Sequence, residues 1–283
     1  MIMLYQERKP RFARRSRTFG KPLLKLGAVI CLSGVAMSVA SFALAQQPIQ
    51  STEQSQSQVP MQNEKSRAEA LTQPYNAQYL LMRRGREHGT ASRTLSVSDE
   101  GHWRYQTTTE ASFLFLSDRR YQDTVFRLQG DQVQPLEFTY RREGTGSNQD
   151  YFVTFDYAEQ TLLSRGGDPV EAEWREHLLD SNAVLHQLQI DVAGNASSWA
   201  YELIDDDGRN RRYEFERESS EVLRLPAGEM ETIRVKRVRE TDRRETYFWF
   251  APMHNYTLVQ MQQIKDGKEQ ARLVLKQLDW ENE

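Results

Sequence analysis

The chain has 283 residues, of which 38% are hydrophobic and 10% aromatic, enough for one large domain or two small ones. The first 45 residues contain eight Lys or Arg and one Glu, which leaves 29 basic and 39 acidic residues and a net charge near −10 in the remainder. This negative charge argues against binding to nucleic acid or to anionic lipid headgroups, because both require a positive field.

The first 45 residues have the three parts of a secretory signal. Eight basic residues precede an apolar run from Leu26 to Ala45, which closes on Ala43-Leu44-Ala45. Cleavage after Ala45 is the favoured interpretation. The alternative is an uncleaved anchor, since this apolar run is just long enough to cross a bilayer. In both cases we expect the rest of the chain in the periplasm, either free or held at the inner membrane.

The single cysteine, Cys31, lies in the apolar run, so the exported part has no disulfide and no thiolate ligand. Residues 46–73 are rich in Gln and Ser and cannot bury enough apolar surface to offset their ordering entropy. We expect a disordered linker over 46–73, with a short helix near 63–71. A single β-rich domain is expected over 74–283.

From Tyr75 onward, apolar and polar residues alternate. Trp103, Tyr105 and Thr107 fall on one face of a predicted strand, and similar alternation recurs along the chain, which predicts a dozen or so short strands. Alternation rich in aromatic and β-branched residues is typical of half-buried strands. Turn dipeptides such as Asp207-Gly208 separate the runs. Short strands joined by tight turns predict an antiparallel meander.

One stretch breaks this alternation and predicts a helix. Leu185 and Leu188 recur at helical spacing within residues 180–192, and Asp180 or Ser181 suits the N-cap. The predicted order is about eight strands, one helix and about six strands. We therefore predict an all-β, mainly antiparallel fold. It would be a strongly curved sheet, barrel or half-barrel, with the helix on its concave face or across its mouth.

Three segments resemble a known family. They are the opening strands at 74–111, the segment "LLDSNAVLHQLQIDV" at 178–192 and the strand "FWFAP" at 248–252. Together they are similar to the bacterial envelope family catalogued as domain of unknown function 3108 (DUF3108), over about residues 75–278. The resemblance implies export and an antiparallel, barrel-like fold, and it supplies no catalytic residues. The helix departs from the family pattern at residues 183–186.

The sequence contains no pattern typical of an active site or a metal site. Its five histidines lack a metal-ligand spacing. The run Asp205–Asn210 resembles a calcium loop, but Arg209 stands where an oxygen ligand is required, so a hairpin turn is favoured. Ser117 and Ser181 each adjoin an aspartate, and a turn and a helix cap explain them. We expect no enzyme activity, no cofactor and no metal.

An aromatic strand suggests where a ligand would bind. Tyr247 and Trp249 alternate with Phe248 and Phe250, so both faces of this strand must be covered. We predict that the two phenylalanines belong to the core and that Trp249 lines a pocket, since inward aromatics of a curved sheet often line cavities. The candidate cavity residues are Trp103, Phe113, Phe115, Leu185, Leu188, Trp199 and Trp249.

These patterns favour a non-enzymatic periplasmic envelope protein that binds an apolar or amphiphilic ligand, such as a lipid, in a β-cup. The alternative is a structural or adaptor protein whose sheet edges or acidic face bind another envelope protein. A hydrolase is the least supported class. Nucleic acid is not an expected partner, and membrane contact is expected only through residues 26–45 if the leader is uncleaved.

The leader generates the first testable prediction. Because the apolar run closes on Ala43-Leu44-Ala45, the mature protein isolated from the envelope should begin at Gln46. N-terminal sequencing measures this directly. A full-length product fixed in the inner membrane would instead support the anchor.

Overall fold

The structure is a computed structural model that describes residues 65–113 and 116–281. The predictions for the leader, its cleavage and the linker up to residue 64 lie outside the described residues. The strands before the principal helix are β1 (Tyr75–Arg83), β2 (Arg86–Val97), β3 (Trp103–Phe113), β4 (Leu116–Gln129), β5 (Gln132–Gly144), β6 (Gln149–Asp156), β7 (Thr161–Leu163) and β8 (Leu179–Asp180).

The principal helix, α2 (Ala183–Val192), follows β8. After it come β9 (Ser198–Ile204), β10 (Asn210–Leu225), β11 (Gly228–Val238), β12 (Arg244–Ala251), β13 (Thr257–Lys265) and β14 (Lys268–Trp280). Two short helices complete the described chain: α1 (Arg67–Leu71) before β1, and the 3-10 helix η1 (Pro252–His254) after β12. The order of eight strands, a helix and six strands confirms the prediction.

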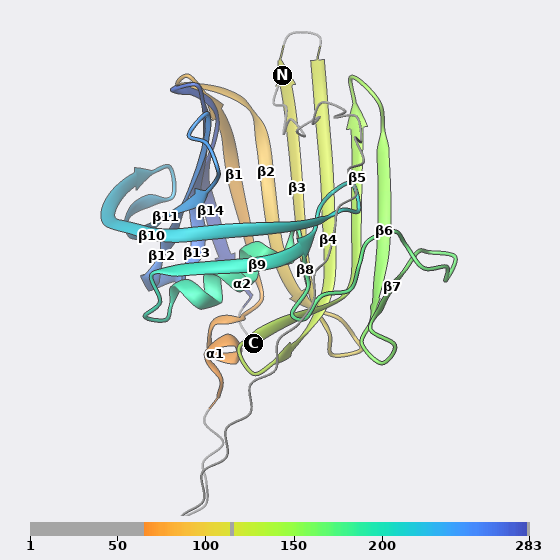
Figure 1. The fold of residues 1–283 in the computed structure, drawn as a ribbon. Helices are drawn as coiled ribbons and strands as arrows, with labels where there is room; N and C mark the ends of the chain where they lie inside the picture. The colour runs from red at the N-terminus through yellow and green to blue at the C-terminus, as the bar shows by residue number, and fades with distance from the viewer. Residues whose placement is uncertain (1–64, 114–115, 282–283) are drawn as a thin grey trace, which may run out of the picture. The chain divides into compact units, whose positions relative to one another are not determined.

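All fourteen of these strands belong to one sheet (Figure 1). The first strand, β1, pairs with the last, β14, so that β1 to β7 form a meander on one side of this pair and β8 to β14 lie on the other. The two edges of the described sheet, β7 and β8, therefore come from the middle of the chain. Every strand pair is antiparallel except β8 with β9. The sheet is mainly antiparallel, as predicted, and it is not closed.

The predicted alternation decides which side chains enter the core. In β1, Tyr75, Ala77 and Tyr79 are buried, whereas Asn76 and Gln78 between them are exposed. Successive side chains of a strand point to opposite faces of the sheet, so the buried set lines one face. This buried set forms the concave side of the sheet in its first half.

Helix α2 packs on the concave face and fills it. Leu188 and Ile190 have no exposed surface. The His186 ring lies 5.6 Å from the ring of Tyr105 in β3 and 5.4 Å from that of Phe126 in β4. The helix is buried on nearly all sides, because β9 and β10 cross the strands of the first half in front of it (Figure 1). Packing of one helix on the concave face was predicted and is confirmed.

The turn between β9 and β10 reaches across to β6. Gln149 of β6 donates a hydrogen bond from Nε2 to Oδ1 of Asp207 at 3.1 Å. Gly208 has a φ of +74°, and a Cβ at this position would collide with the ring of Tyr151. Glycine is therefore required here both by the backbone and by the contact. The predicted hairpin turn is confirmed, and it joins two distant parts of the sheet.

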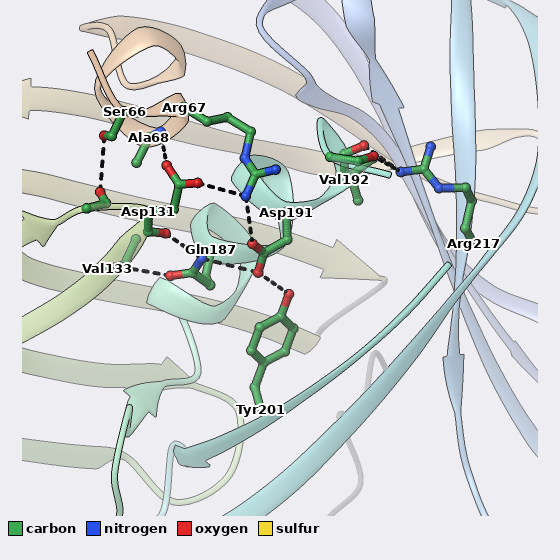
Figure 2. A network of polar contacts seen from close by, with 12 residues as sticks. Ser66, Arg67, Ala68, Asp131, Val133, Gln187, Asp191, Val192, Tyr201 and Arg217 are labelled. Carbon is green, nitrogen blue, oxygen red and sulfur yellow. Dashed lines mark hydrogen bonds and ion pairs between the residues drawn. The ribbon is translucent and has the colours of Figure 1, made fainter. Parts of the chain in front are cut away.

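Helix α1 lies inside the segment predicted to be a disordered linker. Ser66 caps the helix with a capping box, Ala68 has no exposed surface, and Arg67 forms an ion pair with Asp131 at 2.9 Å (Figure 2). The predicted short helix is present, but residues 65–73 are folded rather than disordered. The cap and the burial of Ala68 supply the stabilisation that composition did not reveal. In the described part of the chain, no helix has the length and apolar character needed to cross a membrane.

The packing of α1 generates the second prediction. A protein trimmed to residues 75–283 loses this cap, the ion pair with Asp131 and the hydrogen bond between Thr72 and His186. We expect its free energy of unfolding to fall by roughly 2–4 kcal/mol relative to residues 46–283. Urea denaturation of both proteins measures the difference. Trimming only to residue 65 is the control and should change little; equal stability of all three would contradict the prediction.

Candidate functional site

A slot of about 430 Å³ lies beside the end of helix α2 and is lined in part by the candidate residue Trp199. Its lining includes Trp199 to Glu202 of β9, and we call the aromatic side chains Trp199 and Tyr201 its floor. One wall consists of the chain that follows α2, Gly194 to Ala196, and the other includes Glu176, His177 and Leu179. We call this feature the β9 slot. Its volume lies within the range of small-ligand pockets.

The β9 slot lies along a free edge of strand β9. On one side, all of β9 from Ser198 to Ile204 pairs with β10. On the other side, the described strand β8 pairs only with Leu203 and Ile204. His177, two residues before β8, has a φ of +54°, a left-handed conformation that is uncommon outside glycine. Glu176 and His177 line the slot together with residues 199–202 of β9, which β8 leaves without a described partner strand on this side.

Two aromatic side chains on the slot floor are held by charged groups. The Arg217 guanidinium lies 5.6 Å from the ring centre of Trp199, and its Nη2 also donates to the Val192 carbonyl at 2.6 Å (Figure 2). The Tyr201 hydroxyl donates to Oδ2 of Asp191 at 2.7 Å (Figure 2). Burial raises the pKa of both Tyr201 and Asp191. These contacts fix the floor relative to the end of helix α2.

The rim of the slot carries more negative than positive charge. Glu176, Asp191 and Glu202 line it, against the single cation Arg67, which already pairs with Asp131 at 2.9 Å. The Glu176 side chain is 89% exposed. The slot therefore combines an aromatic floor with an acidic rim.

The five predicted cavity residues whose side chains are described belong to one hydrophobic core or pack against it, and among them Trp199 also lines the β9 slot. Trp199 lies in the β9 slot, and Leu188 is part of the core on the concave face. Trp103 and Leu185 are half-buried against that core, and Trp103 stacks on Phe126 with 6.5 Å between ring centres. The side chains of the two other candidates, Phe113 and Phe115, lie outside the described residues.

Trp249 faces away from the helix. Phe248 contacts Phe215, with ring centres 5.8 Å apart, and Phe215 contacts Tyr201, whose hydroxyl binds helix α2. Trp249 follows Phe248 in the strand and therefore points to the opposite face. It is only 4% exposed, and its Nε1 donates to Oε1 of Glu221 at 2.8 Å. Trp249 and the α2 side chains thus lie on different faces of the sheet.

The hairpin of β10 and β11 explains the burial of Trp249. Its tip folds back over the sheet, and the Ala227 amide donates to the Leu275 carbonyl of β14 at 3.3 Å. Glu221 on the same hairpin binds the indole of Trp249. The core assignment of Phe248 and Phe250 agrees with their exposures of 5% and 0%.

A buried polar network anchors the start of helix α2. Asp180 has no exposed surface, and its Oδ1 accepts hydrogen bonds from Thr124 Oγ1 and from the backbone amides of Asn182 and Ala183. Among the described residues, its Oδ2 has no partner. Burial raises the pKa of Asp180 to about 7. The N-cap is Asn182 rather than the predicted Asp180 or Ser181, although Asp180 still accepts the first helix amides.

His186 lies at the centre of the core and has no exposed surface. Its Nε2 is 3.1 Å from Thr72 Oγ1, and its Nδ1 has no described partner. Burial lowers the pKa of His186 to about 4, so the ring is neutral in the folded protein at neutral pH. Ser181 binds Asp206, not His186, and Gln122 donates to both members of that pair. These groups serve as structural links between α2, β4 and the β9–β10 turn.

The turn that resembled a calcium loop satisfies its own carboxylate. Oδ1 of Asp205 accepts the backbone amides of Asp207 and Arg209, and its Oδ2 accepts from Arg211 at 2.7 Å. In residues 65–113 and 116–281, no group of three or more His, Cys, Asp or Glu side chains is arranged to hold a metal ion.

Comparison with known proteins places the chain in a family. The DUF3108 family model, described as a protein of unknown function, matches residues 74–274. The chain belongs to the DUF3108 family. The suspected resemblance is thereby confirmed over most of the described residues. No curated protein matches the chain at a significant level.

Comparison with solved structures finds similar proteins at low sequence identity. A β-barrel-like DUF1849 protein from Brucella abortus has a TM-score of 0.49 at 10% identity, over 74% of this chain and 98% of that one. A protein named as exported, with a YmcC-like fold, from Bacteroides fragilis has a TM-score of 0.28 at 14% identity, over 72% and 95%. A protein named as a lipoprotein from Parabacteroides distasonis has 0.30 at 12%, over 74% and 96%. With TM-scores below 0.5, no inference rests on these likenesses.

Sequence reasoning found Trp199 but missed the rest of the slot. Tyr201 lies two residues after Trp199, so the alternation predicts that both side chains point to the same face of the strand. Glu176 and His177 gave no signal, because only the left-handed turn at His177 brings them opposite β9. The free edge itself depends on β8 having only two residues.

Two buried titratable residues, Asp180 and His186, generate the third prediction, a dependence of stability on pH. Between about pH 4 and pH 7 the folded protein keeps a proton on Asp180 that the unfolded chain has lost. The stability that this carboxyl contributes is therefore complete below pH 4 and declines as the pH rises to 7. His186 behaves oppositely, because between pH 4 and 6.5 only the unfolded chain binds its proton.

Urea denaturation at pH 4, 5, 6 and 7 checks both signs. The stability of the unsubstituted protein minus that of Asp180→Asn should fall with rising pH, by on the order of 4 kcal/mol in total. The same difference taken for His186→Gln should rise between pH 4 and 6.5. Taking differences cancels the contribution of the buried carboxyl Asp191, whose pKa is set by other neighbours. Differences that do not change with pH would contradict the assignment.

Proposed function

We propose that this DUF3108 protein is an exported, non-enzymatic protein of the cell envelope that binds a molecule with apolar and polar parts in the β9 slot. The observation that carries the proposal is the slot itself. It places the half-buried aromatics Trp199 and Tyr201 under an acidic rim, in a volume of about 430 Å³. Pockets of this size with an apolar floor and few polar groups are typical binding sites.

The slot is preferred to the centre of the cup because helix α2 occupies the cup. The α2 side chains Leu188, Ile190 and His186 are fully buried. A ligand in the same place would have to displace packed side chains, which costs several kcal/mol. The β9 slot is already open and needs no such displacement.

Among the described residues, Ser181 and His186 do not form a catalytic group with each other. Ser181 binds Asp206, and the buried His186 binds Thr72 instead of this pair. A hydrolase of the serine type needs a nucleophile, a base and an orienting acid in contact. Export is proposed from the basic and apolar leader, with the periplasm as the location and the inner-membrane anchor as the alternative.

Binding of the neutral apolar dye Nile red gives the fourth prediction. If the β9 slot is the site, Trp199→Ala should weaken dye binding at least tenfold, because it removes the aromatic floor. Trp103→Ala is the matched control, since Trp103 stacks inside the cup and lies outside the slot. Fluorescence titration at a temperature well below the unfolding transition measures both variants. Loss of binding in Trp103→Ala alone would support the cup, and unchanged binding in both would contradict a site at either place.

A further inference from the structure

We propose that the β9 slot receives an extended segment of a partner protein, which adds a strand to the free edge of β9. This inference rests on the proposed function and specifies its ligand as a polypeptide. It follows from the backbone that borders the slot, from the chemistry of the two faces of β9 and from the covering of the other sheet edge.

The backbone of β9 supplies the first argument. Residues 198–202 pair with β10 on one side and with no described strand on the other. Backbone amide and carbonyl groups at a free edge are a template for another strand. In strand addition, main-chain hydrogen bonds provide affinity, and pockets for alternate side chains provide specificity. The slot lies along this part of the edge, so backbone groups for strand pairing and a pocket for side chains occur in the same place.

Strand β8 defines the length of the β9 edge that is open to such a segment. It already occupies this side of β9 at Leu203 and Ile204, in parallel orientation. The residues before it, Glu176 and His177, form no strand pair with β9 and line the slot beside it. An incoming segment would occupy the length of edge that β8 leaves uncovered.

The side chains of β9 specify the chemistry of the segment. Trp199 and Tyr201 present aromatic surface on one face, while Ala200 and Glu202 alternate with them on the other. Glu176 and Glu202 add negative charge at the rim, and cross-strand pairs of opposite charge stabilise a sheet. A matching segment alternates apolar residues with basic residues.

The opposite edge of the sheet does not offer the same opportunity. Strand β7 has three residues, and Leu163 forms a bridge with Pro169 in the loop that follows it. The Val170 amide also donates to the Leu162 carbonyl at 3.0 Å. The chain thus covers its own β7 edge, which is how proteins commonly block unwanted strand pairing.

The fifth prediction uses a labelled seven-residue peptide of alternating Lys and Val, capped at both ends, with fluorescence anisotropy as the readout. Two analogues carry backbone N-methyl groups, one on its Val residues and the other on its Lys residues. Amides of alternate residues point to the same edge of a strand. We therefore expect one analogue to bind at least tenfold more weakly and the other to bind within threefold of the parent peptide.

A matched pair of charge variants locates the peptide. Glu202 and Glu214 both pair with Arg212, at 3.1 Å and 2.9 Å, but only Glu202 lines the slot. Glu202→Lys should weaken peptide binding at least fivefold, and Glu214→Lys should leave it unchanged. Equal effects of the two variants, or equal effects of the two N-methyl analogues, would overturn the proposal.

The two proposals fail in different ways. If Nile red binding depends on Trp199 but the parent peptide does not bind, strand addition is wrong and the slot binds a small amphiphile. If Trp199→Ala changes neither dye nor peptide binding, the β9 slot is not the site and both proposals are wrong. Pairing of residues 46–64 of the same chain with β9 would appear as tighter peptide binding after trimming to residue 65, and it would overturn the partner as the natural occupant.

Discussion

The pairing of the first strand with the last is the constraint on which the rest of the fold depends. Because β1 pairs with β14, the edges of the described sheet fall in mid-chain, at β7 and β8. The chain must pass from one edge to the other between these strands, and helix α2 follows this passage directly into the concave face. The same passage leaves β8 with only two residues, and β9 keeps a free edge as a result.

Placing a helix in the interior requires its polar groups to be satisfied there. Asp180 accepts the first helix amides, and Asn182 binds Thr107 and the Tyr105 carbonyl. In the middle of the helix, Gln187 accepts the Val133 amide and donates to the Asp131 carbonyl (Figure 2). Buried polar groups without partners are costly, so these bonds fix the helix in one position relative to the sheet.

The same network connects the core to the proposed site. Asp191 of α2 accepts from Gln187 on one side and from Tyr201 of β9 on the other (Figure 2). The slot floor is thus held by the helix that fills the cup. Rigid support of this kind lowers the entropy cost of binding, because the site is formed before the ligand arrives. Filling the cup and forming the slot are two consequences of one helix position.

The sequence by itself determined the elements and their order. Period-two alternation along single strands, such as that of Trp103 and Tyr105, and the helical spacing of Leu185 and Leu188 are local patterns, and local patterns survive in any fold. Parity also grouped Trp199 with Tyr201 correctly. It could not tell which face of β12 pointed inward, because alternation is symmetric between faces. Only the tertiary structure decided that Trp249 lies opposite α2 under the β10–β11 hairpin, that Ala68 of the predicted linker is buried, and that β8 leaves residues 198–202 of β9 without a described partner strand. Each of these depends on contacts between residues far apart in the chain, which periodicity does not record.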